Sequence, residues 1–295
     1  MDCGRAFTPF FLNKINKKYS ISQQIISLAE KTTMDHSSKN AIITGATGAI
    51  GQAIARQMAE KGFSVTLVAR DENKAGRTVS EIIQTTGNKQ VAYLLADLSR
   101  KQEIQKIAQS WNKPLYVLIN NAATTPRRRE ETPEGIEMQF ATNVLGYFWM
   151  IQSFLPFLSL GKPARIVNVA SYWAGDLRME DLECKKRNYD NDTIYRQSKQ
   201  ANRMLTVAFA ERLNNDGITV NAVHPGEVNS KLSNDLGFGG HESPDLGADT
   251  PVWAACAPEL EGLTGSYFEY RKEVKCRFSH DKKAIEELFR ICSSY

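Results

Sequence analysis

Tyr195 and Lys199 are the residues whose types and spacing most directly suggest chemistry. They lie four positions apart in the run YRQSK, and residues at i and i+4 of a helix share one face, so both groups can reach one reacting atom. An unperturbed phenol has a pKa of about 10, but a nearby ammonium favours the phenolate and lowers that pKa. This spacing also arises by chance, with a packing tyrosine as the alternative, so it indicates a tyrosine that exchanges protons only together with the motifs that follow.

The glycine-rich run GATGAIG, residues 45–51, predicts a site for an anion. It follows an apolar run over 40–44 that suits a buried strand, and it leads into a helical stretch over 49–61. Glycines let the backbone approach a pyrophosphate closely, and the first amides of a helix face its charge. The three glycines stand three residues apart, which differs from the usual G-x-G-x-x-G spacing. We interpret the run as the phosphate site of a dinucleotide.

The composition is that of an ordinary soluble protein of 295 residues with a net charge of +4. The tight basic cluster Arg127–Arg129 stands beside acidic residues, which favours a solvated loop over a nucleic-acid surface. The five cysteines are far apart and lack metal-ligand or redox spacing. We therefore expect free thiols, a reducing cytoplasmic setting and no metal site.

No run of the sequence is long and apolar enough to span a bilayer, and the nearest, 146–160, is interrupted by polar residues and a proline. Residues 1–36 are polar and poor in acids. Three interpretations of them stay open: a disordered leader, an organelle transit peptide, or translated sequence upstream of a start at Met34. We expect the folded domain to comprise residues 37–295.

From residue 40 onward, β-rich apolar runs alternate with helical stretches, which favours a parallel sheet with helices on both faces. Strands are expected at 40–44, 64–69, 90–96, 115–119, 164–170, 218–224 and 265–269. Helices are expected at 49–61, 71–86, 100–110, 134–158, 193–214 and 281–292. These elements predict one Rossmann-type, doubly wound α/β domain of about seven strands. Two long loops, 172–192 and 225–258, follow strands, where such folds bind substrates.

Residues 40 to about 290 resemble the short-chain dehydrogenase/reductase family through several motifs in the family's order. The glycine loop comes first, and Asp97-Leu98 follows the third strand. Asn120-Asn121-Ala122-Ala123 is similar to the family's Asn-Asn-Ala-Gly motif. The remaining motif positions are Asn143, Ser171, Tyr195, Lys199 and Pro225-Gly226. Jointly these motifs are far more specific than any one of them.

The resemblance implies a role for each candidate catalytic residue. Tyr195 would be the general acid/base, and Ser171 would hydrogen-bond the same substrate oxygen. Lys199 would hold the nicotinamide ribose and lower the pKa of the tyrosine, while Asn143 would fix a water that links Lys199 to solvent. Tyr195 and Lys199 would also contact the cofactor, together with Gly45, Thr47, Gly48, Ile50, Gly51, Arg70, Asp97, Leu98, Asn121, Ala122, Pro225, Gly226 and Val228.

Two further features resemble the retinol-dehydrogenase-like branch of that family. Ser171 and Tyr195 stand 24 residues apart, wider than in most single-domain members, and the run PELEGLTGSYF over 258–268 is similar to that branch. Its members often carry a membrane anchor, and we find none in this sequence. Ala49 and Ala123 replace glycines of the family motifs, and the glycine spacing is closer to the branch that modifies sugar nucleotides.

The residue after the second strand bears on the choice of cofactor. An acid there binds the ribose hydroxyls of NAD, whereas an arginine accommodates the 2′-phosphate of NADP. Arg70 directly follows the apolar run 65–69, and its guanidinium suits a phosphate in charge and in geometry. We predict NADP(H), with NAD(H) as the alternative if Asp71 faces the ribose instead.

The sequence says less about the substrate than about the cofactor. Tyr172, Trp173 and Leu232 are candidate substrate contacts that suit a lipophilic carbonyl or alcohol, and core packing is the alternative. His224 and His241 have no neighbouring carboxylate or cysteine cluster, so we interpret them as a strand-end and a loop histidine.

These observations predict an oxidoreductase that acts on a lipophilic small molecule. The resemblance also implies a homo-oligomer that assembles through the long helices. Two alternatives stay open: a catalytically idle dinucleotide-binding regulatory or scaffold protein, suggested by Ala49 and Ala123, and a sugar-nucleotide epimerase or dehydratase, suggested by the glycine spacing.

Overall fold

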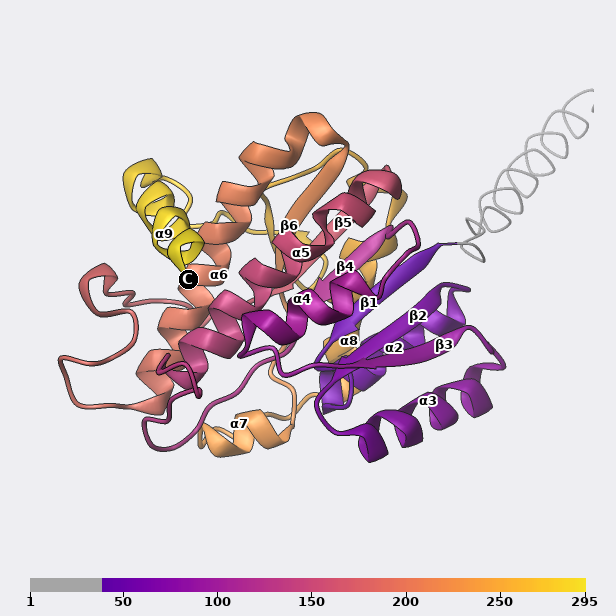
Figure 1. Ribbon diagram of the computed structural model, residues 1–295, viewed down its shortest axis with the longest axis horizontal. Coiled ribbons are helices and arrows are strands. Elements are labelled where there is room, and N and C mark those ends of the chain that lie inside the picture. The colour runs from indigo at the N-terminus through magenta and orange to yellow at the C-terminus, as the bar shows by residue number, and fades with distance from the viewer. Residues whose placement is uncertain (1–38) are drawn as a thin grey trace, which may run out of the picture. The chain divides into compact units, whose positions relative to one another are not determined.

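The computed structural model of the protein describes residues 39–295, so the leader predicted over residues 1–36 lies outside the described residues. The domain is built on one eight-stranded sheet with the strand order β3-β2-β1-β4-β5-β6-β7-β8 (Figure 1). The strands are β1 (Asn40–Thr44), β2 (Ser64–Ala69), β3 (Val91–Leu95), β4 (Val117–Asn120), β5 (Ala164–Val169), β6 (Ile218–His224), β7 (Tyr267–Glu269) and β8 (Lys272–Glu273). The first seven pair in parallel, which confirms the predicted doubly wound sheet, and β8 adds a short antiparallel edge.

Helices cover both faces of this sheet. They are α2 (Ala49–Glu60), α3 (Glu72–Thr86), α4 (Lys101–Gln109), α5 (Gly146–Leu160), α6 (Asn191–Leu213), α7 (Lys231–Asp235), α8 (Pro244–Cys256) and α9 (Lys282–Ser294). Short 3₁₀ turns occupy Met179–Asp181, Asn214–Asp216 and Pro258–Leu260, and the π-helical segment η1 (Phe140–Leu145) leads directly into α5. Free cysteines are found at 184, 256, 276 and 292.

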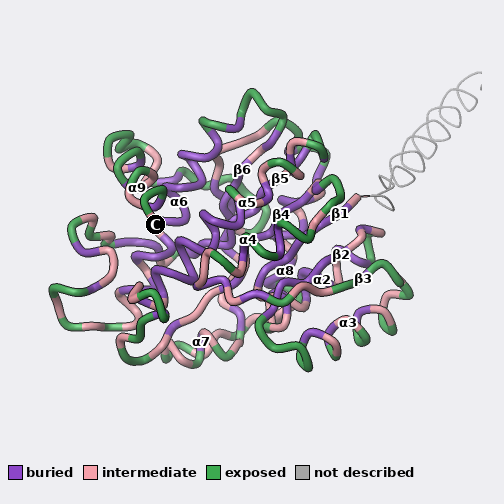
Figure 2. Tube along the Cα trace, viewed as in Figure 1, coloured by how far each residue is buried: buried purple, intermediate pink, exposed green. Residues whose placement is uncertain are grey.

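Two hydrophobic cores lie on opposite faces of the sheet. One packs α4, α5, α6 and α9 against it, and the other packs α2, α3 and α8. Every residue of β1 is buried (Figure 2), because a strand covered on both faces loses solvent on both sides. This accounts for the continuous apolar runs in the central strands.

The interpretation of residues 225–258 as one long loop is wrong, because the segment contains α7 and α8. Its glycines and prolines pointed to a loop, yet Ser243 caps α8 and Pro244 occupies the first turn, where proline is tolerated. Gly247 has a packing role instead, since a Cβ there would meet the Val228 side chain at 2.3 Å. The glycine lets α8 lie close to the segment that follows β6.

The helix expected over 134–158 begins later, at Met138, and contains η1. Glu137 sets its start, because the carboxylate accepts hydrogen bonds from the backbone N–H groups of Gln139 (2.9 Å) and Phe140 (2.6 Å). π-Helical segments are rare and frequently mark functional sites. Here the segment carries Asn143.

Candidate active site

A pocket lies at the carboxyl edge of the sheet and collects nine of the predicted site residues. Strand order reverses on either side of β1, and ligands of such sheets bind at this point. The predicted residues in its wall are Ile50, Ser171, Tyr172, Trp173, Tyr195, Pro225, Gly226, Val228 and Leu232. The glycine loop, the candidate acid/base and the loop after β6 thus meet in one place.

Tyr195 stands near the start of α6, which Asp190 caps by accepting a hydrogen bond from Thr193 N at 2.8 Å. Burial raises the pKa of the Tyr195 phenol, and a hydrogen bond with Ser171 works in the opposite direction. The lowered pKa expected from the Tyr195–Lys199 spacing is therefore wrong for the chain by itself. The physical reason is that burial penalises the charged form of both groups, which the spacing alone does not reveal.

Lys199 lies one turn further along α6 and is only 1% exposed. Its Nζ donates to the Val169 carbonyl at 2.9 Å, and no carboxylate forms an ion pair with it among residues 39–295. Burial lowers the pKa of the lysine to about 7. An ammonium with this pKa holds and releases its proton near neutral pH.

Asn143 is buried on η1, and both polar atoms of its side chain form hydrogen bonds. The Nδ2 group donates to Thr124 O (3.1 Å) and to Ser198 Oγ (3.2 Å), and Oδ1 accepts from Thr124 N (2.8 Å). Ser198 Oγ in turn donates to Tyr195 O at 2.7 Å. Asn143 therefore fastens the loop after β4 to the helix of the candidate acid/base, and a water bound at this residue would rely on its backbone.

The turn after β1 is shaped for a close approach of a ligand's phosphates. Gly45 has φ +63°, and a Cβ there would meet Ala122 Cα at 2.7 Å. Gly48 precedes α2 without any side-chain cap, which leaves the first amides of α2 available to an anion. Thr44, which sequence reasoning missed, accepts hydrogen bonds from Asn121 N (2.9 Å) and Ala122 N (3.1 Å) and so locks the turn to the end of β4.

The residues predicted to contact the adenosine half lie beyond β2 and β3, outside that pocket. Arg70 is exposed and makes no hydrogen bond or ion pair with the residues that the structure describes. Asp71 caps α3, accepting from Lys74 N at 3.0 Å. Asp97 Oδ1 accepts from Ser99 N and Oγ, at 3.0 and 2.8 Å. Leu98 is buried beside it.

The loop after β6 is held by a carboxylate. Gly226 has φ +100°, and Glu242 Oε2 occupies the space that a Cβ would need. That oxygen accepts from Glu227 N at 2.7 Å, and Val228 pairs with Glu242 in an isolated bridge. Glu242 thereby sets the backbone of the Pro-Gly motif.

Aromatic side chains form the substrate side of the pocket. The Trp173 and Phe238 ring centroids are 4.4 Å apart, and the Tyr172 hydroxyl donates to the Glu227 carboxylate. His224 also lines the pocket, although its position at a strand end suggested no such role. Burial lowers its pKa to about 4, and neither ring nitrogen has a partner among the described residues. The adjacent Pro-Gly motif was the sequence signal that could have pointed to it.

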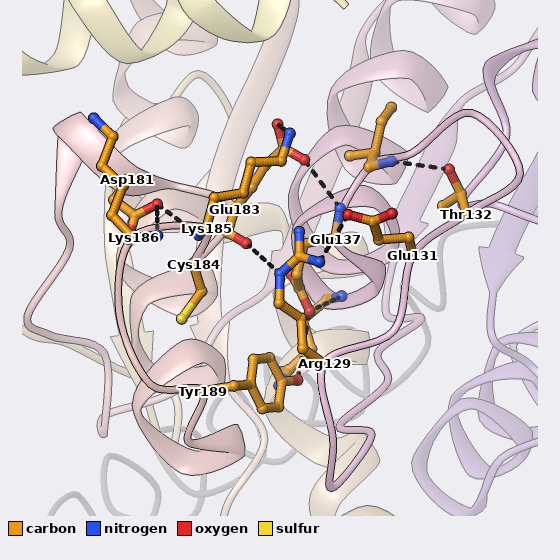
Figure 3. A network of polar contacts seen from close by, with 12 residues as sticks. Arg129, Glu131, Thr132, Glu137, Asp181, Glu183, Cys184, Lys185, Lys186 and Tyr189 are labelled. Atoms are coloured by element: carbon orange, nitrogen blue, oxygen red, sulfur yellow. Dashed lines mark hydrogen bonds and ion pairs between the residues drawn. The ribbon is translucent and has the colours of Figure 1, made fainter.

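The long segment between Ser171 and Tyr195 is fastened to the start of the η1–α5 helix (Figure 3). Arg129 Nε donates to Glu183 O at 3.2 Å, and Glu183 Oε2 accepts from Glu137 N at 3.2 Å. Tyr189 OH accepts from Gln139 Nε2 at 2.9 Å and donates to Pro126 O at 3.1 Å. The segment that accounts for the wide spacing is thus bonded to residues 126–139.

The family model described as short chain dehydrogenase matches residues 39–237. The chain belongs to the short-chain dehydrogenase family. Retinol dehydrogenase 12 of Mus musculus is 35% identical over 269 residues, 86% of this chain and 84% of that protein. Polyprenol dehydrogenase of Homo sapiens is 33% identical over 272 residues, 84% of this chain and 82% of that protein.

Solved structures of this family share the fold. A dehydrogenase/reductase from Sinorhizobium meliloti 1021 has a TM-score of 0.65 at 25% identity, covering 81% of this chain and 95% of its own. Members of the family are oxidoreductases that use nicotinamide dinucleotides. Within residues 39–295, no helix is both long and apolar enough to cross a membrane, and no group of three or more His, Cys, Asp or Glu residues gathers as metal ligands.

Proposed function

We propose that the protein is an NADP(H)-dependent oxidoreductase that transfers a hydride between nicotinamide and a lipophilic carbonyl or alcohol. The observation that carries this proposal is the convergence of Tyr195, Ser171 and the glycine loop residue Ile50 on one pocket. The turn at Gly45 and the uncapped start of α2 fit a dinucleotide, because both offer backbone amides without an intervening side chain.

The chain's own groups would handle the proton. The bound cofactor supplies or accepts the hydride. Tyr195 would give a proton to the substrate oxygen during reduction, or take it during oxidation, and Ser171 would donate a hydrogen bond to that oxygen. Lys199 would hold the ribose hydroxyls, and its positive charge would make the phenolate of Tyr195 more accessible than burial alone permits.

The preference for NADP(H) rests on Arg70 and Asp71. Arg70 is exposed at the end of β2, with its guanidinium uncommitted among the described residues, so it can pair with a 2′-phosphate. Asp71, the acid that would serve NAD, already caps α3. The cap fixes the orientation of this carboxylate toward α3, which favours Arg70 as the group that faces the ribose.

The proposed substrate class rests on the pocket wall. Trp173, Leu232 and Phe238 provide apolar surface next to Ser171 and Tyr195, which suits an apolar molecule with one reacting oxygen. The similar retinol and polyprenol dehydrogenases are named for apolar alcohols. A sugar-nucleotide enzyme is less well supported, because the chain after Pro225 completes the same sheet and core with α8, β7, β8 and α9.

The test is an activity panel of apolar and sugar-based carbonyls and alcohols with NADPH, NADH and their oxidised forms. We expect turnover of apolar substrates with NADP(H), and its loss in Tyr195→Phe. Turnover of no substrate, with cofactor binding retained, would instead support the idle dinucleotide-binding protein. Preferential use of sugar nucleotides would support the second alternative.

The predicted homo-oligomer also stays a proposal. Part of the outer surface of the long helices is already covered by the chain itself, since Phe289 of α9 packs on Phe148 and Phe209 at centroid distances of 5.1 and 5.2 Å. Arg212 stacks on the same Phe289 ring at 3.7 Å. Assembly through α5 and α6 would have to use the surface that α9 leaves open, which light scattering of wild type and an α9 truncation would test.

A further inference from the structure

Tyr147 is a buried tyrosine that no motif singled out, and it lies beside the catalytic candidates. It stands in the first turn of α5 and is 2% exposed. Its hydroxyl donates to the Val169 carbonyl at 3.2 Å, the same oxygen that accepts from Lys199 Nζ at 2.9 Å. A phenol and an ammonium thus share one acceptor at the end of β5.

The Lys199 ammonium also lies within reach of two aromatic rings. Its Nζ is 5.4 Å from the ring centroid of Tyr147 and 5.5 Å from that of Tyr195. Both distances are within the range over which a ring face attracts a cation. The two rings come from different helices, so α5 and α6 each contribute one to the surroundings of this charge.

These rings add to the compensation that the Val169 carbonyl offers for burying the charge. An ammonium has three donors, and Val169 O is the acceptor that the described residues provide. The groups that face it are Tyr147 from α5, Tyr195 from its own helix and the Val169 carbonyl from β5, and no carboxylate contacts it within residues 39–295. Burial disfavours the charged form, whereas the Val169 carbonyl and the two ring faces oppose the loss of the proton.

The neighbouring residue shows that this placement differs from ordinary core packing. Phe148 is equally buried on α5, but its ring contacts Phe209 and Phe289 at centroid distances of 5.2 and 5.1 Å. Only hydrocarbon surrounds it in these contacts. The two side chains therefore form a matched pair: adjacent buried rings on one helix, of which Tyr147 faces the lysine.

We propose that Tyr147 is a positioning residue of the active site. Its ring helps to keep the Lys199 ammonium charged where that ammonium donates to the Val169 carbonyl. The proposal deepens the proposed function and rests on it, because the role of the charge is to assist Tyr195. Tyr147 acts through Lys199 and touches neither substrate nor cofactor in this scheme.

The first test needs no turnover. Lysine side chains labelled with ¹³C would be titrated by NMR in protein without added cofactor, and loss of one signal in Lys199→Met would assign Lys199. We expect that signal to titrate near pH 7 in the wild type. Tyr147→Met, which fills the space without a ring face, should lower the midpoint by roughly 0.5 to 1.5 pH units, and Tyr147→Phe should keep it nearly unchanged.

Phe148→Met is the matched control and should leave the midpoint where it is. If Tyr147→Met does not fold, Tyr147→Leu gives a second variant without the ring. An unchanged or raised midpoint in the ringless variants would overturn the proposal. So would an equal shift in Tyr147→Phe, or an equal shift in Phe148→Met.

The second test is the pH profile of kcat/KM in the oxidoreductase assay. The limb that reports loss of the lysine charge should move to lower pH in Tyr147→Met by the same amount as the NMR midpoint, and stay in place in Tyr147→Phe. A wild type without oxidoreductase activity would defeat the proposed function, whereas an active wild type with unmoved profiles would defeat only the role of Tyr147.

Discussion

The two halves of the carboxyl edge are built on different principles. The proposed cofactor half, around β1, α2 and β4, uses backbone and small polar groups: Gly45 at positive φ, the open start of α2, and Thr44 bonded to the end of β4. The proposed catalytic half, around β5, α5 and α6, uses buried side chains with shifted pKa values, above all Tyr195 and Lys199. The first half offers backbone amides to a charged ligand, whereas the second half buries ionisable side chains of the protein itself.

We therefore expect the first half to determine mainly cofactor binding and the second half to determine mainly catalysis. Groups in the cofactor half keep their hydrogen bonds to one another, so the turn is already formed by the chain and its affinity can be tuned at the exposed Arg70. In the catalytic half the same burial that shifts a pKa also costs stability. Substitutions in the first half should therefore change mainly cofactor affinity. Those in the second half should change turnover and stability, and at Lys199, which would hold the ribose, affinity as well.

The largest effect is expected for Tyr195→Phe. The ring keeps its packing and only the proton-transferring hydroxyl is lost, so kcat should fall on the order of 10²- to 10⁴-fold or more. Cofactor affinity, measured by fluorescence titration, should stay within a few-fold of wild type because the cofactor half is untouched. Turnover near the wild-type level would show that Tyr195 is not the acid/base and that the two halves do not differ in the proposed way.

Lys199→Met should abolish turnover yet stabilise the protein without added cofactor. The folded lysine has its pKa lowered to about 7, so between that value and its ordinary pKa the unfolded chain binds more protons, and stability rises with pH. Removing the charge should raise the free energy of unfolding by on the order of 3 kcal/mol at pH 6 and by less than half of that near pH 9. Urea unfolding at both pH values measures this.

The matched comparison for that variant is Lys199→Arg, which keeps a buried charge. It should be less stable than the methionine variant at both pH values, since a guanidinium does not lose its proton in this range. A methionine variant that is less stable than the wild type at pH 6 would show that the bond to Val169 O outweighs the cost of burial.

Arg70→Ala probes the other half. A charge-assisted hydrogen bond to a phosphate contributes roughly 1.5–3 kcal/mol, so the KM for NADPH should rise about ten- to a hundredfold while that for NADH changes little. Added salt should weaken NADPH binding more in the wild type than in the variant, because an exposed pair is screened. An equal loss for both cofactors would mean that Arg70 supports the loop without reading the phosphate.

The sequence predicted what depends on local pattern. The strands, the glycine turn and the positions of Tyr195 and Lys199 on one helix face follow from periodicity and motif order, and the structure agrees with them. It did not predict α8, since Gly247 and the two prolines of that segment are loop formers by composition. Gly247 is required there by its packing against Val228, and Pro244 is tolerated because it stands in the first turn of α8.

Contacts between residues far apart in the sequence account for the other features that the sequence did not predict. The direction of the Tyr195 pKa depends on burial by residues far apart in the chain, and so does the importance of Tyr147 and His224. Tyr147 sits in an apolar helix where nothing local distinguishes it from Phe148. Only the meeting of α5, α6 and β5 reveals that one of these rings faces a charge.

Asp71→Ala should have the smallest effect, and it tests whether Arg70 or Asp71 faces the ribose of the cofactor. If Asp71 serves α3 as its cap, its loss should lower the free energy of unfolding by about 1 kcal/mol and leave the KM values for NADH and NADPH nearly unchanged. Asp71→Ser, which can still cap the helix, should restore the stability. If Asp71 instead faces the ribose, the alanine variant should lose NADH affinity severalfold and the serine variant should not recover it. In that case Arg70 would point away from the cofactor, and the Asp71 carboxylate rather than the Arg70 guanidinium would discriminate between NAD and NADP.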